Sequence, residues 1–225
     1  MYPPRAPPTR KGLPWGGDGY LLSFPVEKEI PMSPRRDRSP MTTFAEGLEE
    51  NPALGEVRDN IVQPVTALFG QGPVSDLLRG RSMGHALHPV LVQVPLGAIM
   101  SAVALDLTQG KRAARQSRFL VGLACLGALP AVASGLAEWT KADDRTQRVG
   151  VAHAGLNAVG TTAAAVSFLA RLGGWSRFGA ATAVLSSLAY GVSGSLGGHL
   201  SLVRKYASHD TPSTTDGFER GRFDD

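Results

Sequence analysis

Cysteine is nearly absent from this sequence. Cys125 is the only one among 225 residues, and it lies inside an apolar run, so the chain cannot form an internal disulfide. There is no C-x-x-C-H motif and no cysteine framework of the kind that holds an iron–sulfur cluster. A nucleophile motif, an H-E-x-x-H pair and a glycine-rich phosphate loop after a strand are also missing. We therefore do not expect this chain to be an enzyme by itself.

Basic residues are not gathered in the way that a nucleic-acid surface requires. The formal net charge is only +4, and the lysines and arginines are scattered through the tails and short loops. No set of aromatic residues is interleaved with them. We therefore expect no nucleic-acid partner, and we interpret these charges as flanking a membrane.

Both ends of the chain are polar. Residues 1–40 hold more than half of the 16 prolines, and such a segment buries too little apolar surface to become ordered. It is not a signal peptide, because its apolar run Tyr20 to Val26 is short and interrupted. Residues 205–225 are also polar, and we predict disorder in both tails. Met41 opens a more protein-like stretch and is an alternative start of translation.

The segment 41–83 has the pattern of an amphipathic helix. Between Pro52 and Arg81 the apolar residues recur at intervals of three and four, and Pro64 is expected to kink the helix. One interpretation is an interfacial helix that lies on the membrane before the first crossing. The alternative is a small soluble cap packed on the helices that follow.

Long apolar runs dominate the rest of the chain. Four of them predict helices at 89–107, 119–138, 149–171 and 177–203, each near the roughly 20 residues that span a hydrocarbon core. Formal charges stand only at their ends, and the polar outer faces of a soluble bundle are missing. The sequence predicts an all-α protein in which residues 84–204 form a four-helix antiparallel transmembrane bundle.

The short connections between these runs make successive helices antiparallel neighbours. Both termini are then on the same side of the cell membrane, which the chain crosses several times. The positive charges at the two faces nearly balance, so they do not decide the orientation. We expect the termini to be cytoplasmic, because the long polar N-terminal segment lacks a signal for export.

Most of the polar residues of the four helices fall at one membrane face. The up-and-down path brings together histidines from three helices and a Glu-Trp pair from the fourth; the residues are His85, His88, Glu138, Trp139, His153, Asn157 and His199. Ionisable groups at membrane depth usually face the bundle interior and mark a functional site. Asp106 lies near the opposite face, where we expect a solvated residue at a helix end.

This cluster suits two kinds of cofactor. A b-type haem would take two histidines from different helices, His153 with His199 or with His88, and Asn157 and Trp139 would lie beside it. A zinc or copper ion would draw its ligands from His85, His88, Glu138, His153 and His199. Either site would serve electron transfer or metal binding at the membrane.

Each of these residues also has a structural interpretation. The histidines can form a hydrogen-bonded network that fixes helix register in a non-catalytic scaffold or accessory subunit. Trp139 can be an interfacial anchor, Asn157 can join two helices, and Glu138 can pair with a nearby arginine. A transporter or proton pathway is a further alternative, but four short helices leave little room for a pore.

Four ordered motifs carry a family resemblance. The motif G-H-A-L-H-P with V-P-L-G, then G-L-A-E-W, V-G-V-A-H-A-G-L-N and G-G-H-L resemble the family called domain of unknown function 2231, over about Gly84 to Arg204. The family commonly has proline where this chain has Ala86, and aspartate where it has Glu138. The resemblance implies a four-helix bacterial membrane protein without an established activity. Some members look joined to iron–sulfur or cytochrome-type domains, which implies electron transfer with a redox partner protein or within a homo-oligomer.

Overall fold

The computed structural model describes residues 39–203, and every regular element within that range is a helix. The all-α class is therefore confirmed for this part of the chain. The two predicted tails lie outside the described residues, apart from Ser39 and Pro40. Ser39 caps the first helix and Pro40 begins it, so these two residues of the segment predicted to be disordered are ordered.

Three helices precede the long apolar ones: α1 (Pro40–Glu49), α2 (Pro52–Phe69) and α3 (Gly72–Leu78). The first two start in the same way, with a polar cap followed by proline. The Ser39 hydroxyl accepts a hydrogen bond from the Thr42 N–H at 3.2 Å, and Asn51 Oδ1 accepts one from the Ala53 N–H at 2.9 Å. Proline suits the next position because its missing N–H would have no partner there.

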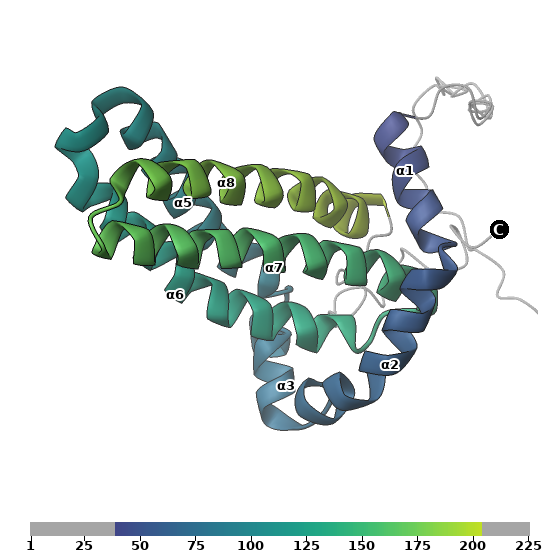
Figure 1. Cartoon of the computed structure of the whole chain (residues 1–225). Coiled ribbons are helices and arrows are strands. Elements are labelled where there is room, and N and C mark those ends of the chain that lie inside the picture. Colours follow the sequence, from purple (N-terminus) through teal and green to yellow (C-terminus); the bar gives the residue numbers. More distant parts are fainter. Residues whose placement is uncertain (1–38, 204–225) are drawn as a thin grey trace, which may run out of the picture. The chain divides into compact units, whose positions relative to one another are not determined.

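The long helices follow a single turn of 3₁₀ helix, η2 (Arg81–Met83). The first is α5 (Gln93–Gln109), which the short helix α4 (His88–Leu91) precedes. After the turn η3 (Gly110–Ala113) come α6 (Ala114–Trp139), α7 (Asp144–Leu172) and α8 (Ser176–Gly198). The last of these ends in the π-helical turn η4 (His199–Val203). Contacts join α5 to α6, α6 to α7, α7 to α8 and α8 back to α5. Figure 1 shows α7 and α8 side by side along their lengths.

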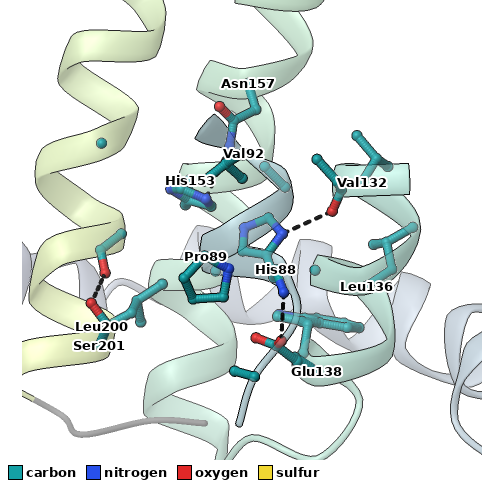
Figure 2. Close-up of a pocket in the computed structure, with 18 of the residues that line it drawn as sticks. His88, Pro89, Val92, Val132, Leu136, Glu138, His153, Asn157, Leu200 and Ser201 are labelled. Atoms are coloured by element: carbon teal, nitrogen blue, oxygen red, sulfur yellow. Dashed lines mark hydrogen bonds between the residues drawn. The ribbon is translucent and has the colours of Figure 1, made fainter. Parts of the chain in front are cut away.

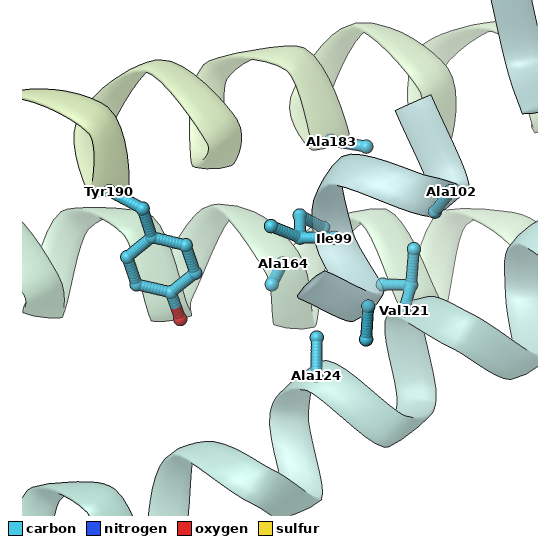
Figure 3. Close-up of a cluster of buried hydrophobic side chains, with 8 residues drawn as sticks. Ile99, Ala102, Val121, Ala124, Ala164, Ala183 and Tyr190 are labelled. Atoms are coloured by element: carbon cyan, nitrogen blue, oxygen red, sulfur yellow. The ribbon is translucent and has the colours of Figure 1, made fainter. Parts of the chain in front are cut away.

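Small residues fill the space between these helices. The main buried cluster joins Ile99, Val121 and Tyr190 to five alanines, among them Ala102, Ala124, Ala164 and Ala183 (Figure 3). Large apolar side chains lie on the outside instead: Phe119 is 69% exposed and Leu126 is 67% exposed. Small residues between helices and large apolar residues outside are the arrangement that a hydrocarbon environment favours, because apolar side chains there gain nothing from burial.

Two helical stretches within the described residues are long and apolar enough to cross a membrane. They are His88–Trp139, whose most apolar 18-residue window has a mean hydropathy of 2.0, and Asp144–Leu172, whose window has a mean hydropathy of 1.2. The first stretch contains α4, α5 and α6. α8 does not reach the same hydropathy, since its serines and glycines dilute its leucines and valines. Two apolar stretches are compatible with a membrane location, and the four separate crossings stay a prediction.

The N-terminal helices pack on the start of α7. Arg58 of α2 donates a hydrogen bond from Nε to Gln147 Oε1 at 2.7 Å and pairs with Asp144. Arg148 donates from Nη1 to the Glu49 carbonyl at the end of α1, at 3.0 Å. These contacts are those of a cap on the long helices, and a position of α2 on the membrane surface stays a prediction.

The long helices meet at two ends. At the first, which we call the histidine end, hydrogen bonds join the start of α4 to the end of α6 and the start of α7 to the end of α8. At the second, which we call the Asp106 end, the end of α5 contacts the start of α6 and the end of α7. This alternation is that of antiparallel neighbours.

The expectation of a solvated Asp106 is wrong. Both carboxylate oxygens of Asp106 pair with the guanidinium of Arg171 on α7, and the two side chains are only 11% and 2% exposed. Arg171 Nε also donates to Ser167 Oγ at 3.2 Å, and this hydroxyl donates to the Gly179 carbonyl of α8 at 2.6 Å. Asp106 is therefore part of a hydrogen-bonded network that joins α5, α7 and α8.

Candidate functional site

A cavity of about 840 Å³ lies at the histidine end. Its walls come mainly from α4, α5, α6, α7 and α8, with small contributions from α2 and the turn η4, and most of its lining is apolar. The polar side chains that reach it are His85, His88, Glu138, Trp139, Thr146, His153, Asn157, Thr161, Tyr190 and Ser201. A volume of ~300–1,000 Å³ with mostly apolar walls and a few convergent polar groups is typical of ligand pockets.

His88 is fixed by the backbone of α6. Its Nδ1–H donates to the Ala131 carbonyl at 2.8 Å, and its own backbone N–H donates to Glu138 Oε1 at 3.3 Å. A carbonyl can only accept, so Nδ1 carries the ring proton of a neutral His88 and Nε2 holds the lone pair. No residue of the described part of the chain forms a hydrogen bond with that Nε2. His88 therefore presents an unused ligand atom.

Two glycines make this position possible. Gly84, at the end of η2, has φ of 74°, a left-handed conformation that side chains rarely adopt, and it turns the chain toward α4. Gly135 of α6 lies against the His88 ring, and a Cβ atom there would be 2.9 Å from Cε1. A side chain on Gly135 would push the imidazole out of its place.

His153 is held on both sides. Its Nδ1–H is 2.9 Å from the Ser193 carbonyl, which accepts it, and the Ser193 hydroxyl donates to the His153 carbonyl at 3.1 Å. Asn157, one turn further along α7, donates from Nδ2 to His153 Nε2 at 2.9 Å. The ring is thus in the same Nδ1–H form as His88, but its lone pair is already engaged.

The two imidazoles lie next to each other at the cavity. Their ring centroids are 6.3 Å apart and their planes make an angle of 79°. Figure 2 shows the His88 ring beside the His153 ring, with Asn157 on the far side of His153 from Pro89. The two rings come from α4 and α7, far apart in sequence, and each is anchored through its Nδ1–H on a backbone carbonyl.

The structure does not bring His199 to this cavity. Its Nε2 is 3.0 Å from Glu49 Oε1 of α1, and both residues are only 6% exposed. The ring is buried between α1 and the end of α8 and is not part of the cavity lining. Of the three histidines predicted to share a ligand, His88 and His153 therefore line the cavity and His199 does not.

The remaining predicted residues line the cavity in other roles. His85 is exposed, and its Nδ1–H donates to the neighbouring Ala86 carbonyl at 3.0 Å. Trp139 is buried and exchanges two hydrogen bonds with Gln147, from Nε1 to the Gln147 carbonyl at 2.9 Å and back from Gln147 Nε2 at 3.1 Å. Glu138 is buried and holds the start of α4 through the His88 N–H.

A metal ion would need more ligands than this arrangement supplies. Within residues 39–203, no three histidine, cysteine, aspartate or glutamate side chains lie close enough together to hold one. The predicted set of His85, His88, Glu138, His153 and His199 is therefore not assembled as a metal site in this structure.

The sequence analysis missed Glu49 and the helix that carries it. The signal was present: Ser39 and Pro40 form a helix start of the kind described above, and Ala45, Leu48 and Glu49 share one face. It also missed Ser193 as a partner of His153. The backbone carbonyl that holds His153 has no signature in a sequence.

One comparison with known proteins identifies a family. No curated protein and no solved structure matches the chain. The family model described as "Predicted membrane protein (DUF2231)" matches residues 84–210, which is more than half of the chain and includes all the residues that line the cavity except Ile61 of α2. This chain therefore belongs to the family of predicted membrane proteins DUF2231.

Proposed function

We propose that this chain is a multi-pass membrane protein that binds a b-type haem between His88 and His153 and serves electron transfer. One observation carries the proposal: two imidazoles from different helices face one apolar cavity with their ring centroids 6.3 Å apart. Each has its Nδ1–H fixed on a backbone carbonyl, so Nε2 is the only possible ligand atom of each ring; it is unused in His88 and accepts from the Asn157 amide in His153.

The number of protein ligands favours haem over zinc or copper. A zinc ion takes three or four ligands from the protein, and among residues 39–203 no three histidine, cysteine, aspartate or glutamate side chains lie close enough together to supply them. Haem iron needs only two axial ligands, because the porphyrin occupies its other positions. A haem would be held by His88 and His153, which come from different helices and lie next to each other at the cavity.

The cavity also fits the chemistry of the group. Its volume of about 840 Å³ and its apolar walls suit a large flat molecule that avoids water. The carboxylates of a haem need water or a cation, and the loop between α6 and α7 offers the exposed Lys141 beside Ala142, which lines the cavity. The fit of a haem therefore requires no charge in the apolar part.

The protein residues would do three things. The hydrogen bond from each Nδ1–H to a carbonyl fixes the rotation of the imidazole and makes its Nε2 a stronger ligand. The apolar lining excludes water from the iron. The glycines at 135 and 197 let the backbone approach the rings of His88 and His153. A bound haem iron carries one electron at a time, which a redox partner protein would supply or remove.

The spectrum of the purified protein tests this proposal. Protein made in cells supplied with iron and haem precursor should show a Soret band, and His88→Ala and His153→Ala should each abolish bis-histidine coordination. His85→Ala is the matched control, because this exposed histidine lies at the same end and should leave the spectrum unchanged. A colourless wild-type protein that also fails to take up added haem overturns the proposal.

The transmembrane arrangement has its own test. The large apolar side chains on the outside and the short connections support four antiparallel crossings. Both termini should lie on one side of the membrane, and we expect that side to be the cytoplasm. Reporter fusions after Thr108 and after Gly173 should then report the face opposite to a fusion after Asp143. Agreement of all three fusions on one face contradicts this topology.

A second function has support from different contacts. His199 Nε2 is paired with Glu49, and both ring nitrogens of His153 form hydrogen bonds, so two of the three inner histidines already have partners at Nε2. These contacts favour a non-catalytic scaffold or accessory subunit in which the histidines fix helix register. In that case His153→Ala lowers the unfolding temperature, and neither the variant nor the wild type binds haem.

A further inference from the structure

We infer that Asn157 is a positioning residue. While the Asn157 amide donates to the His153 ring, His153 cannot bind the iron, and it binds only after this hydrogen bond breaks. The inference rests on the proposed haem function and gives Asn157 a role other than contact with the cofactor. The juxtaposition behind it is an asymmetry between two similar histidines: the His88 lone pair has no partner among the described residues, and the His153 lone pair accepts from the Asn157 amide.

The geometry leaves His153 no second choice of ligand atom. Its Nδ1–H is held by the Ser193 carbonyl at 2.9 Å, and the Ser193 hydroxyl lies at 2.9 Å from the same nitrogen. Only Nε2 can reach a ligand in the cavity, and Nε2 is the atom that Asn157 Nδ2 occupies at 2.9 Å. An iron and an amide proton cannot share one lone pair, so coordination by His153 requires this hydrogen bond to break.

Asn157 is free to make that movement. It is half-buried, lines the cavity and lies four residues after His153, on the same face of α7. No other hydrogen bond of its side chain exists among residues 39–203, so rotation of its amide disrupts nothing else. His88 should therefore bind the iron first, and His153 should follow in a second step that Asn157 opposes.

The competition has a measurable size. A neutral hydrogen bond of this kind changes an equilibrium by about fivefold to tenfold. The wild-type protein should show a fraction of five-coordinate, high-spin haem held by His88 alone. Asn157→Leu removes the amide at similar volume, so it should bind haem about fivefold to tenfold more tightly and shift the spectrum fully to the six-coordinate, low-spin form.

A second variant works in the opposite direction. Asn157→Asp replaces the donor by a carboxylate that accepts from His153 Nε2, and because the Ser193 carbonyl still holds the proton on Nδ1, it favours the ring form with a proton on both nitrogens. This form has no lone pair at Nε2, so the variant should stay five-coordinate at all haem concentrations. Thr162→Val is the control, because Thr162 is an exposed residue of the same helix that does not line the cavity.

The experiment is a spectral titration of the full-length, detergent-purified protein with haem, for wild type and the three variants. A tighter, low-spin Leu variant and a weaker, high-spin Asp variant support the inference. Equal affinity and equal spin state in the wild type and the Leu variant overturn it, although the proposed haem function then stands. If no variant and no wild-type protein binds haem, the proposed function is overturned and this inference with it. In the haem-free protein, ¹⁵N chemical shifts of the His153 ring should show a proton on Nδ1 alone in the wild type and on both nitrogens in the Asp variant. An Nε2 without a proton in both proteins also overturns the inference.

Discussion

The two ends of the long helices treat their polar groups in opposite ways. At the Asp106 end, Arg171 donates to both oxygens of Asp106 and to Ser167, and Ser167 donates on to the Gly179 carbonyl. At the histidine end, a cavity of about 840 Å³ separates the helices, and His88 keeps a lone pair that no described residue uses. One end is packed and fully paired, and the other is open.

The difference shows what distinguishes a ligand-binding site from a polar contact that only holds helices together. A buried charge is expensive unless it is paired, so a closed network such as that of Arg171 stabilises the helix packing and has no capacity left for a ligand. The His199–Glu49 pair shows that a histidine at the histidine end can also be closed. The mark of a binding site is therefore an unused polar atom that faces a cavity, and not the presence of histidine at a helix end.

The largest expected effect comes from removing the Arg171 guanidinium at the Asp106 end. Arg171→Ala leaves the nearly buried carboxylate of Asp106 without its cation, so the free energy of unfolding should fall by about 3–5 kcal/mol. Chemical unfolding in detergent measures this loss. The control Lys111→Ala, an exposed lysine of η3 at the same end, should change stability by less than about 0.5 kcal/mol. A loss below about 1 kcal/mol for Arg171→Ala would mean that water reaches the pair and that the two ends do not differ in this way.

The sequence predicted the helical class and the meeting of His88 with His153. Apolar runs of constant length show where helices are, and short connections show which ends meet, so neither prediction needed the rotation of any helix. The direction of His199 needed exactly that rotation, which is decided by the packing of α1. Its partner Glu49 lies 150 residues earlier in the chain.

The Asp106–Arg171 pair was missed for a related reason. The two residues are 65 positions apart, each at the end of its own apolar run, and charges at such ends are usually solvated. Sequence spacing alone does not show that Gly179 lets α8 approach and cover the guanidinium. The number of polar groups at each end could be predicted, but their pairing required the coordinates.

The next largest effect concerns the buried His199–Glu49 pair at the histidine end. His199→Leu keeps most of the ring volume but removes a partner of the buried Glu49, so unfolding should become easier by about 2 kcal/mol. His199→Gln is the matched control, because its amide can still donate to the carboxylate. Haem binding, measured by spectral titration, should be unchanged in both. A lost Soret band in a folded His199→Leu protein would return His199 to the list of axial ligands.

A glycine at the Asp106 end gives a smaller effect. A Cβ on Gly179 would lie 2.7 Å from Arg171 Cγ and 3.1 Å from the Ser167 carbonyl, in a region without space to relax. Gly179→Ala should therefore cost about 1.5 kcal/mol despite the better helix propensity of alanine. The thermal midpoint in detergent measures it. Gly155→Ala on α7 is the control, since nothing lies within 4 Å of its Cβ, and it should be neutral or stabilising.

The smallest effect on stability belongs to the matching glycine at the histidine end. A Cβ on Gly135 would lie 2.9 Å from His88 Cε1, nearly as close as the contact at Gly179. Here the neighbour is a ring at the edge of a cavity, so His88 can shift into empty space, and Gly135→Ala should lower stability by less than about 1 kcal/mol. The shift lengthens the hydrogen bond from Nδ1 to the Ala131 carbonyl and moves Nε2, so haem affinity should fall much more than stability does.

Measuring both quantities for Gly135→Ala and Gly179→Ala separates the two ends: the Gly135 variant should lose affinity and the Gly179 variant should lose stability. Equal losses of stability in both variants would contradict the contrast between an open end and a closed one.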